Sequence, residues 1–333
     1  MTYVLGVDGG ASKTHAVVVD DRGCVLGFGS AGCANHQVAG LQPAIEEIGT
    51  AAATAIASAG LAPEAIERGY YCLAGADLEE DYRMLRKAVT ELRLAQDVSV
   101  KNDTMAALRA GLTKPWGVAV ICGTGFNAAG RGPDGRELIL PGLGFISGDW
   151  GGGGQLSQEI IRLVMRAWDG RGAKTRLTGR VLAQLDVSSE EMLMRHLYNG
   201  KIKHRQLLQL VPLLFEVAQE GDGPARQLIV VMGKEVAITA NALLRRLCLQ
   251  DDEVEVVLAG GVFRGKGSLL IDTVGEEVHK VAPYASIQRL HLAPVVGAAL
   301  LALEAAGVVS DDALYGNLQR TLPEKLRHRQ VDY

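Results

Sequence analysis

Apolar and polar positions alternate in short blocks along the first sixty residues. β-prone runs at 3–8, 15–20 and 24–28 are separated by the glycine-rich GGASKT and the charged DDRG, as in strands joined by tight turns. An alanine-rich segment at 43–59 follows, in which isoleucines recur at roughly helical spacing. The pattern predicts a β-hairpin, a third strand and a helix, which is the opening of an α/β domain.

The same order of elements begins again after residue 115. Strand and helix patterns alternate from residue 69 onward, until the apolar run Gly117 to Cys122 ends in a second glycine turn and leads to another strand-like run. Each half of the chain thus begins with a strand, a turn rich in Gly, Ser and Thr, and a returning strand. This is a weak internal repeat.

The rest of the chain is largely helical from 151 to about 247, with a strand pattern at 253–263. The last apolar stretch, 292–303, is shorter than the roughly 18 to 20 residues that a membrane span needs, so we expect a buried helix there.

The length of the chain sets the number of hydrophobic cores. A chain of 333 residues with 48% hydrophobic content suits two core-bearing domains better than one. We predict an N-terminal domain at 1–115, a C-terminal domain at 116–305, and a tail at 306–333 that packs on the body. Two domains imply a cleft, and strands that end in glycines are typical of α/β domains that bind a ligand at the carboxyl ends of the strands.

Composition excludes several classes of function. The formal net charge is only -4 and the Lys and Arg residues form no basic run, so nucleic acid is not an expected partner. The first residues lack the pattern of a signal peptide, and we expect a cytoplasmic protein that is not bound to a membrane. The five cysteines are spread singly, without zinc-ligand spacing, and are expected to be reduced and mostly buried.

Three glycine turns follow predicted strands. The first consists of Gly9, Gly10, Ala11, Ser12, Lys13 and Thr14. Its closely spaced N–H groups, two hydroxyls and Lys suit a phosphate chain, although an ordinary glycine hairpin remains an alternative. It is not a Walker A loop, because a strand pattern follows it instead of a helix.

The other two turns are weaker signals. The second is Gly123, Thr124 and Gly125, and the third is the pair Gly260 and Gly261, which offers a flat surface for an adenine or a ribose. Taken alone, a glycine pair after a strand is more often only a turn.

Two acidic residues stand where strand or loop patterns turn into helices. Asp103 could project into a cleft or cap the helix, since Asp is a favoured N-cap residue. Asp149 could also be a cap, but six glycines among residues 144–154 exceed what a cap requires and suggest backbone close to a ligand. Phosphoryl transfer needs donors and a metal around the triphosphate, and a carboxylate for the acceptor hydroxyl. In this scheme Asp8 holds Mg²⁺ through water and Asp103 is the base.

Five motifs in chain order carry a resemblance to a known family. They resemble the N-acetylglucosamine kinase group of the BadF/BadG-type ATPases, within the actin and hexokinase superfamily, over residues 3 to about 304. The motifs are VLGVDGGASKTHAVVVD, VKNDTMAAL, VAVICGTGFNAAGRGPDG, GLGFISGDWG and VVLAGGVF. The resemblance implies an α/β fold of two actin-like (ribonuclease H-like) domains with an interdomain cleft. It also implies ATP and Mg²⁺ as cofactors, a homodimer, and transfer of phosphate to a hydroxyl, expected at C6, of an amino sugar such as N-acetylglucosamine or glucosamine.

The resemblance also implies roles for single residues. The segment from Asp8 to Thr14 would form the first phosphate loop, with Ser12 at a phosphate-contacting position, and Gly123 to Gly125 the second. Asp103 would be the catalytic residue and would contact the sugar. The expected sugar pocket consists of Asn35, Asp103, Gly142, Leu143 and Asp149, and the expected nucleotide contacts further along the chain are Gly221, Gly260 and Gly261.

Two features of the resemblance concern the cleft lining. Gly75 and Asp77 resemble a family segment that lines the cleft. Leu143 stands where these kinases typically have a Trp, and Trp150 follows Asp149, so the sugar pocket is not identical to theirs and a hexose or another N-acyl hexosamine stays open as the substrate.

Two other functions fit parts of the pattern. The first is the ATPase activator of the benzoyl-CoA reductase or 2-hydroxyacyl-CoA dehydratase type, which needs accessible cysteine thiolates for an iron–sulfur cluster. Cys72 and Cys122 fall inside strand patterns, which weighs against such a pair. The second is a non-catalytic nucleotide or sugar sensor. A repressor of this kind would carry a helix-turn-helix domain, and the sequence starts directly with the phosphate-loop strand.

Overall fold

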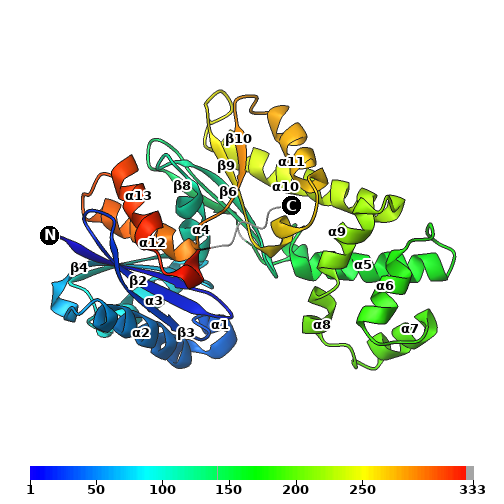
Figure 1. Ribbon diagram of the computed structural model, residues 1–333, viewed down its shortest axis with the longest axis horizontal. Helices are drawn as coiled ribbons and strands as arrows, with labels where there is room; N and C mark the ends of the chain where they lie inside the picture. The colour runs from blue at the N-terminus through cyan, green and yellow to red at the C-terminus, as the bar shows by residue number, and fades with distance from the viewer. Residues whose placement is uncertain (141, 328–333) are drawn as a thin grey trace. The chain divides into compact units, whose positions relative to one another are not determined.

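The computed structural model describes residues 1–140 and 142–327, and their contacts divide the chain into two compact units. Unit 1 contains residues 1–116 and 290–327, and unit 2 contains residues 117–289. Each unit is built on one five-stranded mixed sheet with helices packed against it (Figure 1). The predicted α/β class is confirmed.

The sheet of unit 1 has the strand order β3-β2-β1-β4-β5. Its first three strands are antiparallel neighbours, and β4 and β5 are parallel to β1. The strands are β1 (Tyr3–Gly9), β2 (Thr14–Asp20), β3 (Val25–Ala31), β4 (Ile66–Leu73) and β5 (Asp97–Asn102). The helices of this unit are α1 (His36–Ala39), α2 (Leu41–Ser58), α3 (Glu79–Glu91), α4 (Asp103–Gly111), α12 (Pro294–Ala305) and α13 (Asp312–Thr321).

Alternation along the strands puts helices on both faces of this sheet. Leu5 and Val18 belong to the core cluster that includes the buried side of α2. Gly27 on the same face lets α2 approach so closely that a Cβ would lie 2.0 Å from the carbonyl oxygen of Ala55. Gly6 faces the other way, where a Cβ would lie 2.4 Å from the backbone nitrogen of Ala299 in α12. Helices α2 and α12 therefore cover opposite faces of the sheet.

The sheet of unit 2 repeats this arrangement. Its order is β10-β9-β6-β7-β8, with β6, β7 and β8 antiparallel and β9 and β10 parallel to β6. Read from β8, this is the order of unit 1, as expected from the weak internal repeat. The strands are β6 (Gly117–Cys122), β7 (Phe126–Arg131), β8 (Glu137–Leu140), β9 (Glu255–Ala259) and β10 (Ser286–Arg289). The α-helices are α5 (Gly153–Trp168), α6 (Leu177–Gln184), α7 (Glu190–Tyr198), α8 (His204–Leu208), α9 (Val211–Gln219), α10 (Gly223–Arg246) and α11 (Leu269–His279).

Helix α10 is the one helix of the described residues that is long and apolar enough, by length and composition, to cross a membrane. In its most apolar window 56% of the helix is buried, and it packs against α9, α11 and the sheet. This is the pattern of a core helix.

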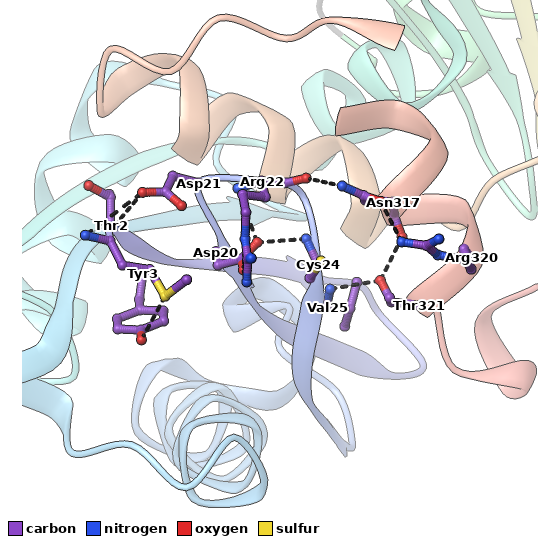
Figure 2. Close-up of polar contacts among 11 residues, drawn as sticks. Thr2, Tyr3, Asp20, Asp21, Arg22, Cys24, Val25, Asn317, Arg320 and Thr321 are labelled. Carbon is purple, nitrogen blue, oxygen red and sulfur yellow. Dashed lines mark hydrogen bonds and ion pairs between the residues drawn. The ribbon is translucent and has the colours of Figure 1, made fainter. Parts of the chain in front are cut away.

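Helices α12 and α13, which follow unit 2 in the sequence, pack in unit 1 with the first residues of the chain. The prediction that the C-terminal domain extends to residue 305 differs from the structure, because α12 packs on β1, β4 and α4 of unit 1. Figure 2 shows the next attachment, where α13 meets the β2–β3 hairpin. Asn317 donates from Nδ2 to the carbonyl oxygen of Arg22 at 2.8 Å, and the Thr321 hydroxyl oxygen accepts from the backbone N–H of Val25 at 2.8 Å.

The close contact between α12 and α4 gives a stability prediction. A Cβ on Gly297 would lie 1.9 Å from the carbonyl oxygen of Ala106, so Gly297→Ala should force the two helices apart and lower the free energy of unfolding by about 1–3 kcal/mol. Gly316→Ala, in α13 of the same unit, meets nothing within 4 Å and should raise stability by about 0.5–1 kcal/mol. Urea unfolding of both variants measures this. Equal effects would contradict the packing account.

Candidate functional site

In unit 1 the carboxyl ends of three parallel strands meet at one edge of the sheet. The register pairs Gly9 of β1 with Leu73 of β4, and Leu73 with Asn102 of β5. Asp8 therefore lies at the same edge as Asp103, which is the first residue of α4. The parallel pairing brings together two carboxylates that are far apart in the sequence.

The first glycine turn is held in place by its backbone. Gly10 donates to the carbonyl oxygen of Lys13 at 3.0 Å and accepts from Ala34 at 3.0 Å, while the carbonyl oxygen of Gly9 accepts from Ala74 at 2.8 Å. Ala11, Ser12 and Lys13 are exposed at the tip. The backbone of the turn is thus fixed while its tip faces outward, an arrangement that can receive an anion.

Thr14 differs from its neighbours in the turn. Its side chain is fully buried, and its hydroxyl donates to the carbonyl oxygen of Gly32 at 2.7 Å. This hydroxyl joins the turn to the segment after β3, so the position carries a structural contact that the motif alone did not indicate.

The two carboxylates bind protons more tightly than usual. Burial, followed by the negative charge of Asp103, raises the pKa of Asp8 to about 7, and Lys13 opposes the shift. Burial, followed by the charge of Asp77, raises the pKa of Asp103 to about 6, against the effect of the backbone N–H groups of Asp103 and Thr104. A carboxyl that titrates this close to neutrality can accept a proton and release it again.

The helix cap at Asp103 is provided by its neighbour. Asn102 is the N-cap of α4, with its Oδ1 accepting from the backbone N–H of Thr104 at 2.9 Å. The alternative that Asp103 serves as the N-cap is therefore wrong. Its carboxylate stands in the first helical turn, where the helix dipole favours negative charge.

Asn35 lies beside the same strand edge. Its Oδ1 accepts from the backbone N–H of Gln37 at 2.8 Å and caps α1. A Cβ on Gly75, which has a φ of 84°, would lie 3.1 Å from this oxygen. The structure thus gathers Asn35, Gly75 and Asp103 at one edge of unit 1.

In unit 2 the second and third glycine turns adjoin each other. Gly260, with a φ of 104°, lies so close to the end of β6 that a Cβ would be 2.3 Å from the carbonyl oxygen of Cys122 and 2.9 Å from the backbone nitrogen of Gly123. Only a glycine fits both the conformation and the space. The two turns that follow β6 and β9 form one glycine-lined surface, which continues into Gly261.

The glycine run before α5 closes against the second turn. The backbone N–H groups of Gly153 and Gly154 donate to the carbonyl oxygens of Gly123 and Thr124, at 2.8 and 2.9 Å. A Cβ on Gly152 would lie 2.6 Å from the carbonyl carbon of Gly125. The excess of glycines in this segment is thus explained by backbone packed directly on backbone.

Asp149 is engaged within its own loop. Its Oδ2 accepts from the backbone N–H of Gly144 at 2.9 Å and from the Ser147 hydroxyl at 3.0 Å. Gly142 and Leu143 belong to the same exposed loop, and the side chain of Leu143 is 73% exposed. Here the carboxylate shapes a surface loop, a contact that the sequence did not indicate.

Unit 2 also contains a pocket of about 360 Å³ that the motifs did not identify. Gly221, with a φ of 87°, lies in the turn between the two helices that form one wall, α9 and α10. The polar residues that line the pocket are Gln219, Arg226, Lys266, Ser268 and Asp272. They come from three separate segments, so only the nearby Gly221 gave any sequence signal.

The profile of the BadF/BadG/BcrA/BcrD ATPase family matches residues 5–302. The chain belongs to this family. The N-acetyl-D-glucosamine kinase of Dictyostelium discoideum is 33% identical over 311 residues, covering 90% of this chain and 97% of that protein. The N-acetylmuramic acid/N-acetylglucosamine kinase of Clostridium acetobutylicum is 28% identical, covering 79% of this chain and 86% of that protein.

Solved structures of low sequence identity share the fold of this chain. The ROK hexokinase of Thermus thermophilus has a TM-score of 0.61 at 18% identity, covering 92% of this chain and 99% of that one. A structure from Chromobacterium violaceum, provisionally named an N-acetylglucosamine kinase, has a TM-score of 0.68 at 24% identity, covering 91% and 99%. The two-domain actin-like fold predicted from the sequence is confirmed.

The raised pKa of Asp8 predicts a pH-dependent stability. An unfolded Asp ionises near pH 4, whereas folded Asp8 ionises near pH 7, so the folded state binds more protons between these values. Asp8 therefore lowers stability progressively as the pH rises from about 4 to about 7, and the full penalty is present above that range. Asp8→Asn should be more stable than the parent at pH 8 by about 1–3 kcal/mol, a figure reduced because the side chain is partly exposed.

Urea unfolding at pH 8 and pH 4.5 checks this prediction. The gain should be largest at pH 8 and small at pH 4.5. Asp252→Asn, at an exposed position before β9, is the control and should change little at either pH. A gain for Asp8→Asn that does not depend on pH would contradict the electrostatic explanation.

Proposed function

We propose that this protein is an ATP-dependent kinase that phosphorylates a hydroxyl, at C6, of an amino sugar such as N-acetylglucosamine or glucosamine. The observation that carries the proposal is Asp103, a carboxyl with a pKa of about 6 at the strand edge that also bears the glycine turn Gly9–Lys13. The likeness to amino-sugar kinases over most of the chain supports the same reaction.

Asp103 accepts the proton of the sugar hydroxyl as the phosphoryl group is transferred. Because phosphoryl transfer depends on alignment and charge stabilisation, the base must be fixed in position. The cap at Asn102 and the first turn of α4 fix it. Ionised Asp103 is present at neutral pH, and protonated Asp103 becomes dominant below about pH 6.

Asn35, whose side chain lies against Gly75, contributes to sugar binding. Since its Oδ1 caps α1, its Nδ2 group is the part that donates to a sugar oxygen. Asp149 and Leu143 act through the loop 142–149, which presents an apolar side chain where a Trp is typical of the family. This difference keeps a hexose or another N-acyl hexosamine among the substrates to test.

Each unit offers groups that suit a nucleotide. In unit 1 these are Ser12 and Lys13 at the tip of the first turn, and in unit 2 they are the N–H groups of the second turn, Gly123–Gly125, both of which suit phosphate oxygens. The glycine surface at Gly260 and Gly261 and the pocket beside Gly221 receive the nucleoside, for which 360 Å³ is a suitable size.

The residues present fit a bound Mg²⁺. Asp8 supplies a carboxylate at the edge of the sheet beside the phosphate turn, and Mg²⁺ is typically held by one or two carboxylates together with waters and phosphate oxygens. When bound, the ion neutralises phosphate charge and lowers the barrier to transfer. A nearby cation would also hold Asp8 in its ionised form, against the effect of burial.

The activator function is less well supported by the cysteines. Cys72 and Cys122 are buried, Cys24 and Cys33 are partly buried, and Cys248 is exposed, so fewer are buried than the sequence suggested. Within the described ranges no three His, Cys, Asp or Glu side chains cluster as metal ligands.

We further propose that the kinase is a soluble, cytoplasmic homodimer.

The experiment that tests the function is coupled ADP release with Mg·ATP against a panel of sugars. The panel is N-acetylglucosamine, glucosamine, N-acetylmuramic acid, N-acetylmannosamine and glucose. ADP release that requires an amino sugar supports the proposal, and NMR of the product identifies the phosphorylated hydroxyl. Bound ATP without sugar-dependent release from any member would contradict it.

Asp103→Asn gives a specific prediction for the mechanism. The amide keeps the shape of the side chain but cannot accept the proton, so kcat should fall by at least about 100-fold. ATP affinity, measured by calorimetry, should stay within about threefold because Asp103 is proposed to contact the sugar. Asp252→Asn should keep full activity. A comparable loss of ATP binding and turnover would indicate a structural role for Asp103.

A further inference from the structure

One carboxylate at the strand edge of unit 1 has no part in the proposed reaction. Asp77 lies in the loop between β4 and α3, and both of its oxygens accept hydrogen bonds from residues beside the site. Its Oδ1 accepts from Nδ2 of Asn102 at 2.9 Å, and its Oδ2 accepts from Nε2 of Gln37 at 3.3 Å.

Each donor is itself attached to a proposed site residue. Asn102 is buried, caps α4 through its Oδ1, and directly precedes Asp103. Gln37 donates its backbone N–H to Oδ1 of Asn35 at 2.8 Å. Asp77 is therefore the middle member of a continuous hydrogen-bonded chain from Asn35 through Gln37 and Asn102 to the start of α4.

A second carboxylate holds this loop in position. Oδ2 of Asp81 accepts from the backbone N–H groups of Asp77 and Leu78, at 3.3 and 2.9 Å, and its Oδ1 lies 3.4 Å from Nε2 of His36. The loop is thus fixed to α3 and α1 at once. The exposed Asp77 carboxylate is restrained although it lies at the surface.

We propose that Asp77 is a positioning residue that fixes Asn35 and Asp103 relative to each other. The proposal rests on the proposed function, since it concerns how the two residues meet one sugar. Asp77 places a negative charge near Asp103, and like charges favour the protonated form of the neighbour. The network therefore links sugar binding to the charge state of the base.

Other charged groups around the base are kept unchanged in the test. Asp8 faces Asp103 from β1, with Lys13 beside it, and Lys101 precedes Asp103 on β5. His36 and Asp81 face Asp77 from α1 and α3. On the remaining side, Arg109 of α4 is paired with Glu304 of α12. Only the charge at residue 77 differs between the first variant and the parent.

Asp77→Asn tests the electrostatic part. It removes the charge and keeps Oδ1 as an acceptor for Asn102. The acid limb of the pH profile of kcat/KM should move by about 0.5 to 1 unit to lower pH, because the proton on Asp103 becomes easier to remove. A merely structural role would lower activity without moving the limb. Glu80→Gln, which changes an exposed carboxylate on the adjoining helix α3, should leave the limb in place.

Asp77→Ala tests the positioning part. Both hydrogen bonds are lost, so the KM for the sugar should rise about tenfold, which corresponds to one lost hydrogen bond, while the KM for ATP stays within about twofold. An unmoved acid limb in Asp77→Asn together with an unchanged sugar KM in Asp77→Ala would overturn the proposal and leave the kinase function standing.

A double-mutant cycle gives a readout that does not depend on turnover. Asp77→Asn and Asp103→Asn each relieve the same repulsion, so their effects on the free energy of unfolding should be less than additive at pH 8. At pH 4.5, where Asp103 is protonated, they should become additive. Additivity at both pH values would overturn the coupling. If the parent shows no sugar-dependent turnover, the proposed function fails, and the cycle still decides whether Asp77 and Asp103 are coupled.

Discussion

The parallel pairing of β1, β4 and β5 is the constraint on which the candidate site depends. Residues that end these strands are separated by long stretches of sequence, yet the register aligns Gly9, Leu73 and Asn102 at one edge. Every polar group proposed to act in unit 1 belongs to a segment that leaves this edge. The backbone hydrogen bonds between the parallel strands therefore set the positions of the site residues, and the identities of their side chains determine the chemistry.

This arrangement lowers the stability of the folded protein because it places carboxylates in a partly buried site. Two carboxylates, Asp8 and Asp103, are partly buried at the same strand edge, and the charge of a third, Asp77, adds to the repulsion on Asp103. Burial, followed by like charge, raises both pKa values, so the folded protein is less stable when both carboxylates are ionised and no cation is bound. Such sites are expected where function requires a poised base, and the compensating stability comes from the apolar layers formed by α2 and α12 on the two faces of the sheet.

Local structure could be predicted from the sequence more fully than the long-range contacts could. The strand, glycine turn and returning strand could be recognised because each depends on neighbouring residues, and so could the strand-to-helix step at Asp103. Within the stretch expected to be largely helical from 151 to about 247, α8 and α9 are separate helices, and Pro212 in the first turn of α9 marks the new start. The pocket beside Gly221 and the hydrogen bonds of Asp149 within its own loop could not be predicted from local sequence patterns.

The attachment of α12 and α13 to unit 1 has a consequence for how the chain folds during synthesis. The ribosome completes residues 117–289 before it releases the helices that cover one face of the first sheet. Unit 2 is thus an insertion that can reach its own fold while Gly6 and its neighbours still lack α12. The N-terminal unit, although made first, is completed only after unit 2, and its apolar face needs protection until α12 and α13 emerge, at least several seconds at about 5–20 residues per second.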